Sequence, residues 1–150
     1  MTLYDAAGGR DRLLAMTAAF YGKATADDLI GPMFGRAAAD HANYLAGWMS
    51  ASFGGPRDYL AERGDLAFVI WKHAGLRITD AQRARWARLM MEAAAEVDMP
   101  RTFTVPFRRY VDAITRATQD HSNADPAWLK ARLGLEGTDV VPQGLADADR

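Results

Sequence analysis

The sequence predicts an all-α fold in which one helical domain is followed by a short C-terminal extension. Apolar residues recur at helical spacing through most of the chain, and no alternating strand of convincing length interrupts them. Glycine and proline gather between these periodic segments, where they mark turns. The length of 150 residues is typical of a single domain, and no repeat period divides it. These three observations favour helices packed around one core.

The first two expected helices span residues 10–24 and 40–53, with Asp40 as the N-cap of the second. The dipeptide Gly31-Pro32 predicts a turn between them. The inner face of each helix follows the spacing i, i+4, i+7, i+8 and i+11. These faces consist of Leu13, Thr17, Phe20, Tyr21 and Ala24 in the first helix, and of His41, Leu45, Trp48, Met49 and Ser52 in the second.

Two further helices are expected after a less regular region. Thr79 and Gln82 have the spacing of a capping box, which predicts the start of one helix. Another helix is expected from Thr104, with Pro106 in its first turn. Their inner faces are expected to consist of Trp86, Leu89, Met90, Ala93 and Val97 in the first, and of Phe107, Tyr110, Val111, Ile114 and Thr118 in the second.

Residues 1–121 are expected to form the main domain and residues 122–150 the extension. Asp125 followed by Pro126 predicts an N-cap with proline at the first helical position, so a short helix is expected at about 126–133. The remaining tail offers few residues to bury and is expected to be mobile. Two apolar side chains of this region are expected to pack against the domain rather than to bind a partner: Trp128 and Leu133.

Composition and charge exclude several classes of function. A net charge of −1 and a pI near 6.3 give no basic footprint for nucleic acid. No run of about 18 apolar residues is present, so no membrane span is expected. The N-terminal sequence lacks the basic start and apolar core of a signal peptide, which predicts a cytoplasmic protein. The absence of cysteine removes disulfides, zinc–thiolate sites, iron–sulfur clusters and thiol nucleophiles.

The motifs of common enzyme chemistries are also absent. The chain has no G-x-x-x-x-G-K-[ST] phosphate loop and no G-x-G-x-x-G after a strand. It contains neither H-E-x-x-H nor G-x-S-x-G, and three widely separated histidines do not favour a zinc hydrolase. Any chemistry therefore depends on isolated imidazoles among apolar and aromatic side chains.

The three histidines differ in their sequence surroundings. His41 lies on the inner face of its expected helix, and His73 lies where a short apolar helix ends, directly after Lys72. His121 lies among polar residues and is expected to be exposed. Taken singly, His41 and His73 have an ordinary structural interpretation, because a helix-end imidazole can bond a backbone carbonyl or interact with the helix dipole.

Taken together, two of these histidines suggest a cofactor. His41 and His73 come from different helices that each direct an imidazole inward, and Tyr21, Phe34 and Trp86 are available near them. Imidazole nitrogen is a common protein ligand of haem iron, and a large flat apolar cofactor needs an apolar and aromatic lining. An ordinary aromatic core has the same periodicity, so the pattern favours a haem pocket without excluding a packed core.

Five short motifs occur in a characteristic order: LYDAAGG, FYGK, SFGGPRDY, HAGLRIT and ARWARLM. In this order and spacing they resemble the truncated haemoglobins, specifically the second group of that family, over roughly residues 3–120. The resemblance implies a truncated globin fold, a two-over-two helical sandwich around one haem b (iron protoporphyrin IX).

The resemblance also implies roles for individual residues. His73 matches the proximal iron ligand, which binds through its ε nitrogen while the other ring nitrogen donates to a backbone carbonyl. The apolar run before it would line the cofactor. On the opposite face, Tyr21 and Trp86 match the distal tyrosine and tryptophan, and Phe34 matches an aromatic wedge at the porphyrin edge.

His41 matches the distal gate position and is a candidate second iron ligand, with Leu45 one helical turn deeper. Further contacts with the cofactor are implied for Tyr59 and Lys72 at the propionates, assisted by Arg57, and for Ile78; Tyr44 replaces a residue that is often basic. The chain departs from the family at Gly75, where a proline is common, and in the apolar stretch before His73, which is one residue longer.

The function that this resemblance implies is reversible binding of O₂ and other diatomic ligands, such as CO or NO, at the haem iron. Three candidate hydrogen-bond donors, Tyr21, Trp86 and His41, predict slow O₂ release, which favours sensing, scavenging or redox duty over simple transport. Alternative functions are a haem redox enzyme, peroxidase-like or nitric-oxide dioxygenase with an external reductase, and a haem-free helical interaction module. A monomer or homodimer is expected.

Overall fold

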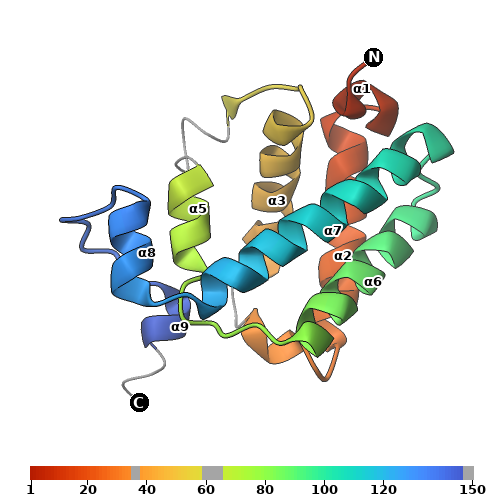
Figure 1. Cartoon of the computed structure of the whole chain (residues 1–150). Helices are drawn as coiled ribbons and strands as arrows, with labels where there is room; N and C mark the ends of the chain where they lie inside the picture. The colour runs from red at the N-terminus through yellow and green to blue at the C-terminus, as the bar shows by residue number, and fades with distance from the viewer. Residues whose placement is uncertain (35–37, 59–65, 147–150) are drawn as a thin grey trace.

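Every element in the described part of the chain is helical (Figure 1). The computed structural model describes residues 1–34, 38–58 and 66–146. Within these ranges, no helix is long and apolar enough to cross a membrane. The elements are α1 (Leu3–Ala7), α2 (Arg10–Ala26), the 3₁₀ helix η1 (Gly31–Met33), α3 (Ala38–Ser52), α5 (Leu66–Lys72), α6 (Asp80–Glu96), α7 (Arg101–Asn123), α8 (Pro126–Arg132) and α9 (Gln143–Ala146).

Four long helices build the body of the molecule. Helix α2 packs against both α3 and α6, and α6 packs against α7, which crosses in front of α3 in the view of Figure 1. The core between them is largely apolar and rich in phenylalanine and methionine, and its few buried polar side chains include Thr17 and Ser50. Its largest buried side chains include Phe20, Phe103, Phe107, Met16, Met49 and Met90.

Local capping signals set the helix starts as expected. The Thr79 hydroxyl accepts a hydrogen bond from the Gln82 amide at 3.1 Å, and the Gln82 side chain accepts one from the Thr79 amide at 2.9 Å. This capping box satisfies two backbone amides that the helix itself leaves unpaired. Thr2 and Asp5 form a second capping box at α1, which the sequence analysis did not predict.

Helix α7 starts earlier than predicted. It begins at Arg101 after Pro100, so that Pro106 lies inside the helix rather than in its first turn. The missing amide of Pro106 removes one backbone hydrogen bond. Burial of Phe103, whose ring stacks on Phe107 at 4.6 Å between centroids, favours the additional turn.

The buried face of α3 is shifted relative to the prediction. Ala42, Ala46 and Met49 are buried, whereas His41 and Leu45 are only half-buried. The small alanines allow close approach to α2, and the Thr17 hydroxyl of α2 donates to the Ala42 carbonyl at 2.8 Å. Two other predictions for this helix are wrong, since Ser52 is exposed and Asp40 lies in the first turn instead of capping it.

The C-terminal residues pack more extensively than expected. Asp125 caps α8 as predicted, because its carboxylate accepts from the Trp128 amide at 2.8 Å. Trp128 itself is 57% exposed, so the prediction that it packs against the domain is wrong. Beyond α8, Pro142 is buried and Leu145 packs in a second apolar cluster with Trp71, so the tail has packing partners that its composition did not predict. The boundary between domain and extension at residues 121 and 122 stays a prediction.

Candidate functional site

His73 follows α5 directly, and its imidazole is held by the preceding helical turn. Its Nδ1 lies 2.8 Å from the Val69 carbonyl oxygen. A carbonyl can only accept, so Nδ1 carries the proton, and the Nε2 of the neutral ring keeps a free lone pair. Burial lowers the pKa of His73, and the neighbouring charge of Lys72 lowers it further. A lowered pKa favours the neutral ring, in which Nε2 is the nitrogen that can accept a bond.

The chain around His73 makes a tight turn. The His73 carbonyl accepts from the Leu76 amide at 3.3 Å, and Gly75 adopts φ +78°, a left-handed conformation that glycine tolerates without strain. The next residues are tied to the end of α7. The Ser122 hydroxyl accepts from the Ile78 amide at 3.1 Å, and the Asn123 side chain donates to the Ile78 carbonyl at 3.0 Å.

Of the residues expected to contact the propionates, Lys72 is the last residue of α5. Lys72 is exposed, and its ammonium lies 4.9 Å from the centroid of the Phe68 ring. Arg57 is also exposed, and Tyr59 lies outside the described residues. The roles of these three residues at a propionate stay predictions.

The predicted distal residues meet in one group of rings. The centroid of Tyr21 lies 5.5 Å from that of Phe34 and 5.7 Å from that of His41, so the ring of Tyr21 joins α2, the turn after η1 and α3. Phe20 extends the group to α6, because its centroid lies 4.9 Å from Trp86. We call these five residues, Phe20, Tyr21, Phe34, His41 and Trp86, the distal cluster.

Burial differs within the distal cluster. Phe20 is completely buried in the main core, and the other four members are half-buried. Leu45 is half-buried on the same core. Phe20 therefore anchors the cluster, while its other members keep part of their aromatic surface accessible. Such a surface is suited to a large flat apolar ligand.

A partly buried hydrogen-bond network, which was not predicted from the sequence, braces the segment that carries Phe34. The Asp27 carboxylate accepts from the amides of Leu29 and Ile30 at 2.9 and 3.1 Å, and from the Arg85 guanidinium at 2.7 Å. Although burial raises the pKa of Asp27, these hydrogen bonds outweigh it and lower the pKa below its ordinary value. The network connects the end of α2 with the residue that precedes Trp86.

A second cross-link ties α3 to α7. The indole of Trp48 donates to the Tyr110 hydroxyl at 3.2 Å. Burial raises the pKa of the Tyr110 hydroxyl, so this group stays protonated at neutral pH. Trp48 lies on the half-buried side of α3, one turn from Leu45, and thus this bond supports the same helix face.

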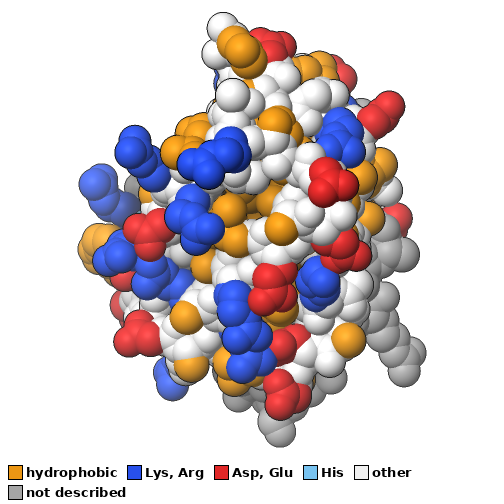
Figure 2. Space-filling view, turned by 90° about the vertical axis from the view of Figure 1, so that its right-hand side faces the viewer, with side chains coloured by type: hydrophobic (Ala, Val, Ile, Leu, Met, Phe, Trp, Pro, Cys, Tyr) orange, Lys and Arg blue, Asp and Glu red, His pale blue; other side chains and the backbone are white. Residues whose placement is uncertain are grey.

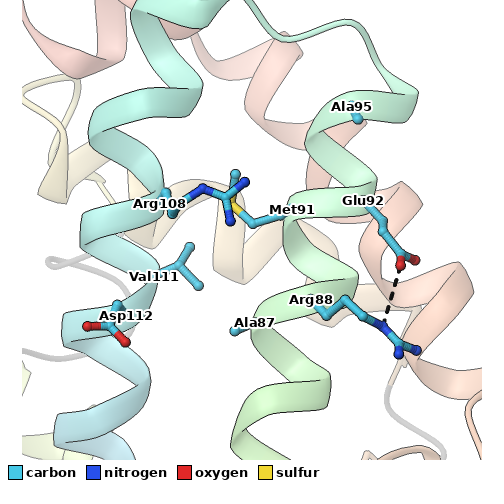
Figure 3. A pocket seen from close by; sticks show the side chains of 8 residues that line it. All are labelled: Ala87, Arg88, Met91, Glu92, Ala95, Arg108, Val111 and Asp112. Carbon is cyan, nitrogen blue, oxygen red and sulfur yellow. Dashed lines mark ion pairs between the residues drawn. The ribbon is translucent and has the colours of Figure 1, made fainter.

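Other surface features lie apart from these residues. Figure 2 shows apolar side chains at the bottom of a hollow, flanked by basic and acidic side chains. Figure 3 shows such a groove between α6 and α7, and no predicted site residue lines it; its lining residues are Ala87, Arg88, Met91, Glu92, Ala95, Arg108, Val111 and Asp112. His121, predicted to be exposed, is half-buried in α7, where its Nδ1 lies 2.6 Å from the Ala117 carbonyl.

The possible metal-binding side chains of this site suit a metal that is already held by a cofactor. No group of three or more His, Asp or Glu side chains among the described residues is placed to hold a bare metal ion. What the described residues offer instead is the imidazole of His73, whose Nδ1 faces the Val69 carbonyl, and aromatic surface on other helices. A porphyrin supplies four equatorial nitrogens and needs an axial ligand and an apolar lining, so these residues fit haem.

The model of the bacterial-like globin family matches residues 2–119. The chain is similar in structure to a thermostable haemoglobin from the actinobacterium Thermobifida fusca, with 26% identity, 79% of this chain and 96% of that chain covered, and a TM-score of 0.69. It is also similar to the group II truncated haemoglobin of Bacillus anthracis, with 19% identity, 79% and 90% coverage and a TM-score of 0.73. The truncated oxygen-avid haemoglobin of Bacillus subtilis gives 20% identity, 79% and 98% coverage and a TM-score of 0.72.

Proposed function

Because the chain belongs to the bacterial-like globin family, we propose that it binds one haem b through His73 and reversibly binds O₂ or another diatomic ligand there. The observation that carries the proposal is the orientation of the His73 imidazole. Its Nδ1 donates to the Val69 carbonyl at 2.8 Å, which leaves Nε2 to bind iron. The lowered pKa of His73 supports this role, because only the neutral ring can be a ligand.

The other site residues hold and surround the cofactor. When bound, haem supplies an iron with one coordination position for a diatomic ligand. Phe34, Leu45 and Ile78 offer apolar surface to the porphyrin, while Lys72 offers a positive charge to a propionate. His73 holds the iron on one face, and its hydrogen bond to Val69 fixes which ring nitrogen is free.

Three side chains can donate hydrogen bonds to the diatomic ligand: Tyr21, Trp86 and His41. The ring contacts that join them through the distal cluster support their acting together. A hydrogen bond is worth about 1 kcal/mol, and about 1.4 kcal/mol changes an affinity tenfold. Several donors predict slow ligand release, which favours sensing, scavenging or redox duty with an external reductase over transport.

Visible absorption spectra of the haem-reconstituted chain test this proposal. We expect a five-coordinate ferrous spectrum that shifts fully with carbon monoxide, and its loss in His73→Gly. His121→Ala is the matched control, because the Nδ1 of His121 also faces a carbonyl one helical turn earlier, yet we expect an unchanged spectrum. The absence of a Soret band in the wild-type chain would contradict haem binding and favour a helical interaction module.

A second candidate function is a haem redox enzyme, peroxidase-like or nitric-oxide dioxygenase. The contact between His41 and Tyr21 favours it, since a distal imidazole can accept and return a proton during peroxide turnover. A six-coordinate low-spin ferrous spectrum that becomes five-coordinate in His41→Ala would assign His41 as the second iron ligand. Peroxide turnover at full rate in His41→Ala would remove the proton-transfer role.

A further inference from the structure

The C-terminal segment, defined here as Pro126–Leu145, covers the side of α5 at the base of His73. Trp71, two residues before His73, is only 3% exposed, and its indole donates to the Val140 carbonyl at 3.1 Å. Lys130 of α8 lies 5.8 Å over the Trp71 ring and donates to the Thr138 carbonyl at 2.7 Å. The indole is thus in contact both with α8 and with the chain that follows α8.

The same segment also touches the turn that follows His73. A Cβ atom on Gly75 would lie 2.5 Å from Leu145, and a Cβ atom on Gly144 would collide with the backbone of Gly75 and Leu76. The direct approach of the two backbones therefore restricts Gly144 to glycine, whereas Gly75 is restricted by its φ of +78° and by the Leu145 side chain. The last turn of α5 and the C-terminal segment lie in contact along this short stretch.

This packing is separate from the main core. Trp71 and Ala74 are buried in a cluster with Leu129, and Leu133, Leu135 and Leu145 pack against it, whereas the main core consists of residues from other helices. Figure 1 shows α8 and α9 beside α5, near the end of α7. The family match ends at residue 119, before the C-terminal segment begins.

Backbone hydrogen bonds at the end of α5 hold both Trp71 and His73. The Trp71 carbonyl accepts from the Ala74 amide at 3.0 Å, and the His73 amide donates to Ile70 at 3.1 Å. The ring itself is held by the carbonyl of Val69 on the same short helix. A displacement of this seven-residue helix therefore moves the ring with it.

We propose that the C-terminal segment positions His73 toward the haem iron, with Trp71 and Gly144 as its positioning residues. This inference rests on the proposed function for its consequence at the iron. It predicts that loosening the segment changes the strength and orientation of the bond between iron and His73, while haem is still bound. It also predicts faster local opening of residues 74–76 in the protein without haem.

Two full-length variants test the inference. Trp71→Phe keeps an aromatic ring but removes the indole donor to Val140, and Gly144→Ala pushes the segment away from Gly75. In the haem-free chain, we expect the amides of Ala74 and Leu76 to exchange hydrogen about tenfold faster in either variant. In the ferrous haem protein, we expect the iron–imidazole stretching band to shift and broaden in resonance Raman spectra.

Each variant has a matched control. Trp128→Phe changes the exposed tryptophan of α8, and Gly22→Ala adds a methyl group to α2 where no atom lies within 4 Å. Neither control is expected to alter the exchange of residues 74–76 or the stretching band. If one test variant does not fold, the other still decides, since each perturbs a different contact of the segment.

The outcomes separate this inference from the proposed function. An unchanged stretching band in a chain that binds haem through His73 would overturn the positioning role. If wild-type and His73→Gly chains had the same spectrum, the proposed function would fail instead. Hydrogen exchange of residues 74–76 in the haem-free protein would then be the remaining test of whether the C-terminal segment holds the turn after His73. Equal exchange rates in the test variants and the controls would show that it does not.

Discussion

The distal cluster and His73, on the two sides of the candidate site, are supported by different apolar clusters. The distal cluster is carried by the three long helices α2, α3 and α6 and by the turn after η1, and its member Phe20 is completely buried in the main core. His73 follows α5, a helix of seven residues, whose buried residue Trp71 belongs to the smaller C-terminal cluster. Distal geometry thus depends on the stability of the whole domain, whereas proximal geometry depends on a local set of contacts.

This difference matters for how such a site can be tuned. Local sets of contacts open with less free energy than a core, because fewer buried groups must be exposed. A change in the C-terminal segment can therefore alter the proximal ligand without altering the distal donors. Changes at the distal cluster have to preserve the main core.

The largest expected effect is on the free energy of unfolding, and it should differ between the main core and the C-terminal cluster. Phe20→Ala removes a buried ring from the main core and should lower the global free energy of unfolding by about 3–5 kcal/mol. Trp71→Ala should expose the amides of α5 to exchange while the protection of α2 is kept. Urea unfolding and hydrogen exchange measure both effects.

The control for these core variants is Val105→Ala, because Val105 is exposed and its truncation opens no cavity. If Trp71→Ala lowered the protection of α2 as much as Phe20→Ala does, the two regions would be one cooperative unit. The comparison between them would then fail.

The next effect concerns the distal donors alone. Tyr21→Phe combined with Trp86→Phe removes two hydrogen bonds to the diatomic ligand, so the O₂ dissociation rate should rise at least about tenfold. The iron–imidazole stretching band should stay where it is, since His73 is untouched. Stopped-flow displacement of O₂ by carbon monoxide measures the rate, with Trp128→Phe as control. An unchanged dissociation rate would show that these side chains do not reach the ligand.

Much of the fold could be predicted because its signals are local. The starts of α6 and α8 follow from the caps at Thr79 and Asp125, each formed with an amide three residues away. The spacing of Leu13 and Phe20 likewise predicts the buried face of α2. Four members of the distal cluster, Tyr21, Phe34, His41 and Trp86, were predicted by resemblance to the truncated haemoglobins. Phe20 was predicted only as a core residue from its helical spacing, and its ring links Trp86 to the others.

What could not be predicted depends on distant residues. The sequence predicts Trp71 as part of an apolar run that lines the cofactor, but its indole donates a hydrogen bond to the carbonyl of Val140, 69 residues later. Arg85 and Asp27 are 58 residues apart, and no periodicity connects them. The inner face of α3 was misplaced for a related reason. Its alanines are buried because α2 approaches closely there, which the apolar spacing alone does not reveal.

A smaller effect should come from the network at Asp27. Asp27→Asn weakens the bond to Arg85 and should lower Tm by about 2–4 °C at neutral pH. The lowered pKa of Asp27 means that its contribution is present above the pKa of the unfolded chain and is lost as pH falls through the folded value. The difference in Tm between wild type and variant should therefore shrink in acid.

Asp28→Asn is the matched control for this prediction. Asp28 lies beside Asp27 and reaches Arg85 at 3.4 Å, but its side chain is 97% exposed. An exposed ion pair adds little stability, so the Tm of Asp28→Asn should stay close to that of wild type. An equal decrease in Tm in the two variants would show that negative charge near Arg85, rather than the hydrogen-bond network at Asp27, stabilises this part of the structure.

The smallest expected effect tests the link between α3 and α7. Trp48→Phe removes the indole donor to Tyr110 and should lower the free energy of unfolding by about 0.5–1.5 kcal/mol. Because Tyr110 also interacts with Ser52, a double-mutant cycle with Tyr110→Phe is needed to isolate the Trp48 bond. This bond joins two helices of the main body, so its loss should leave the exchange of residues 74–76 unchanged. Faster exchange there would mean that the helix carrying His73 depends on the main body after all.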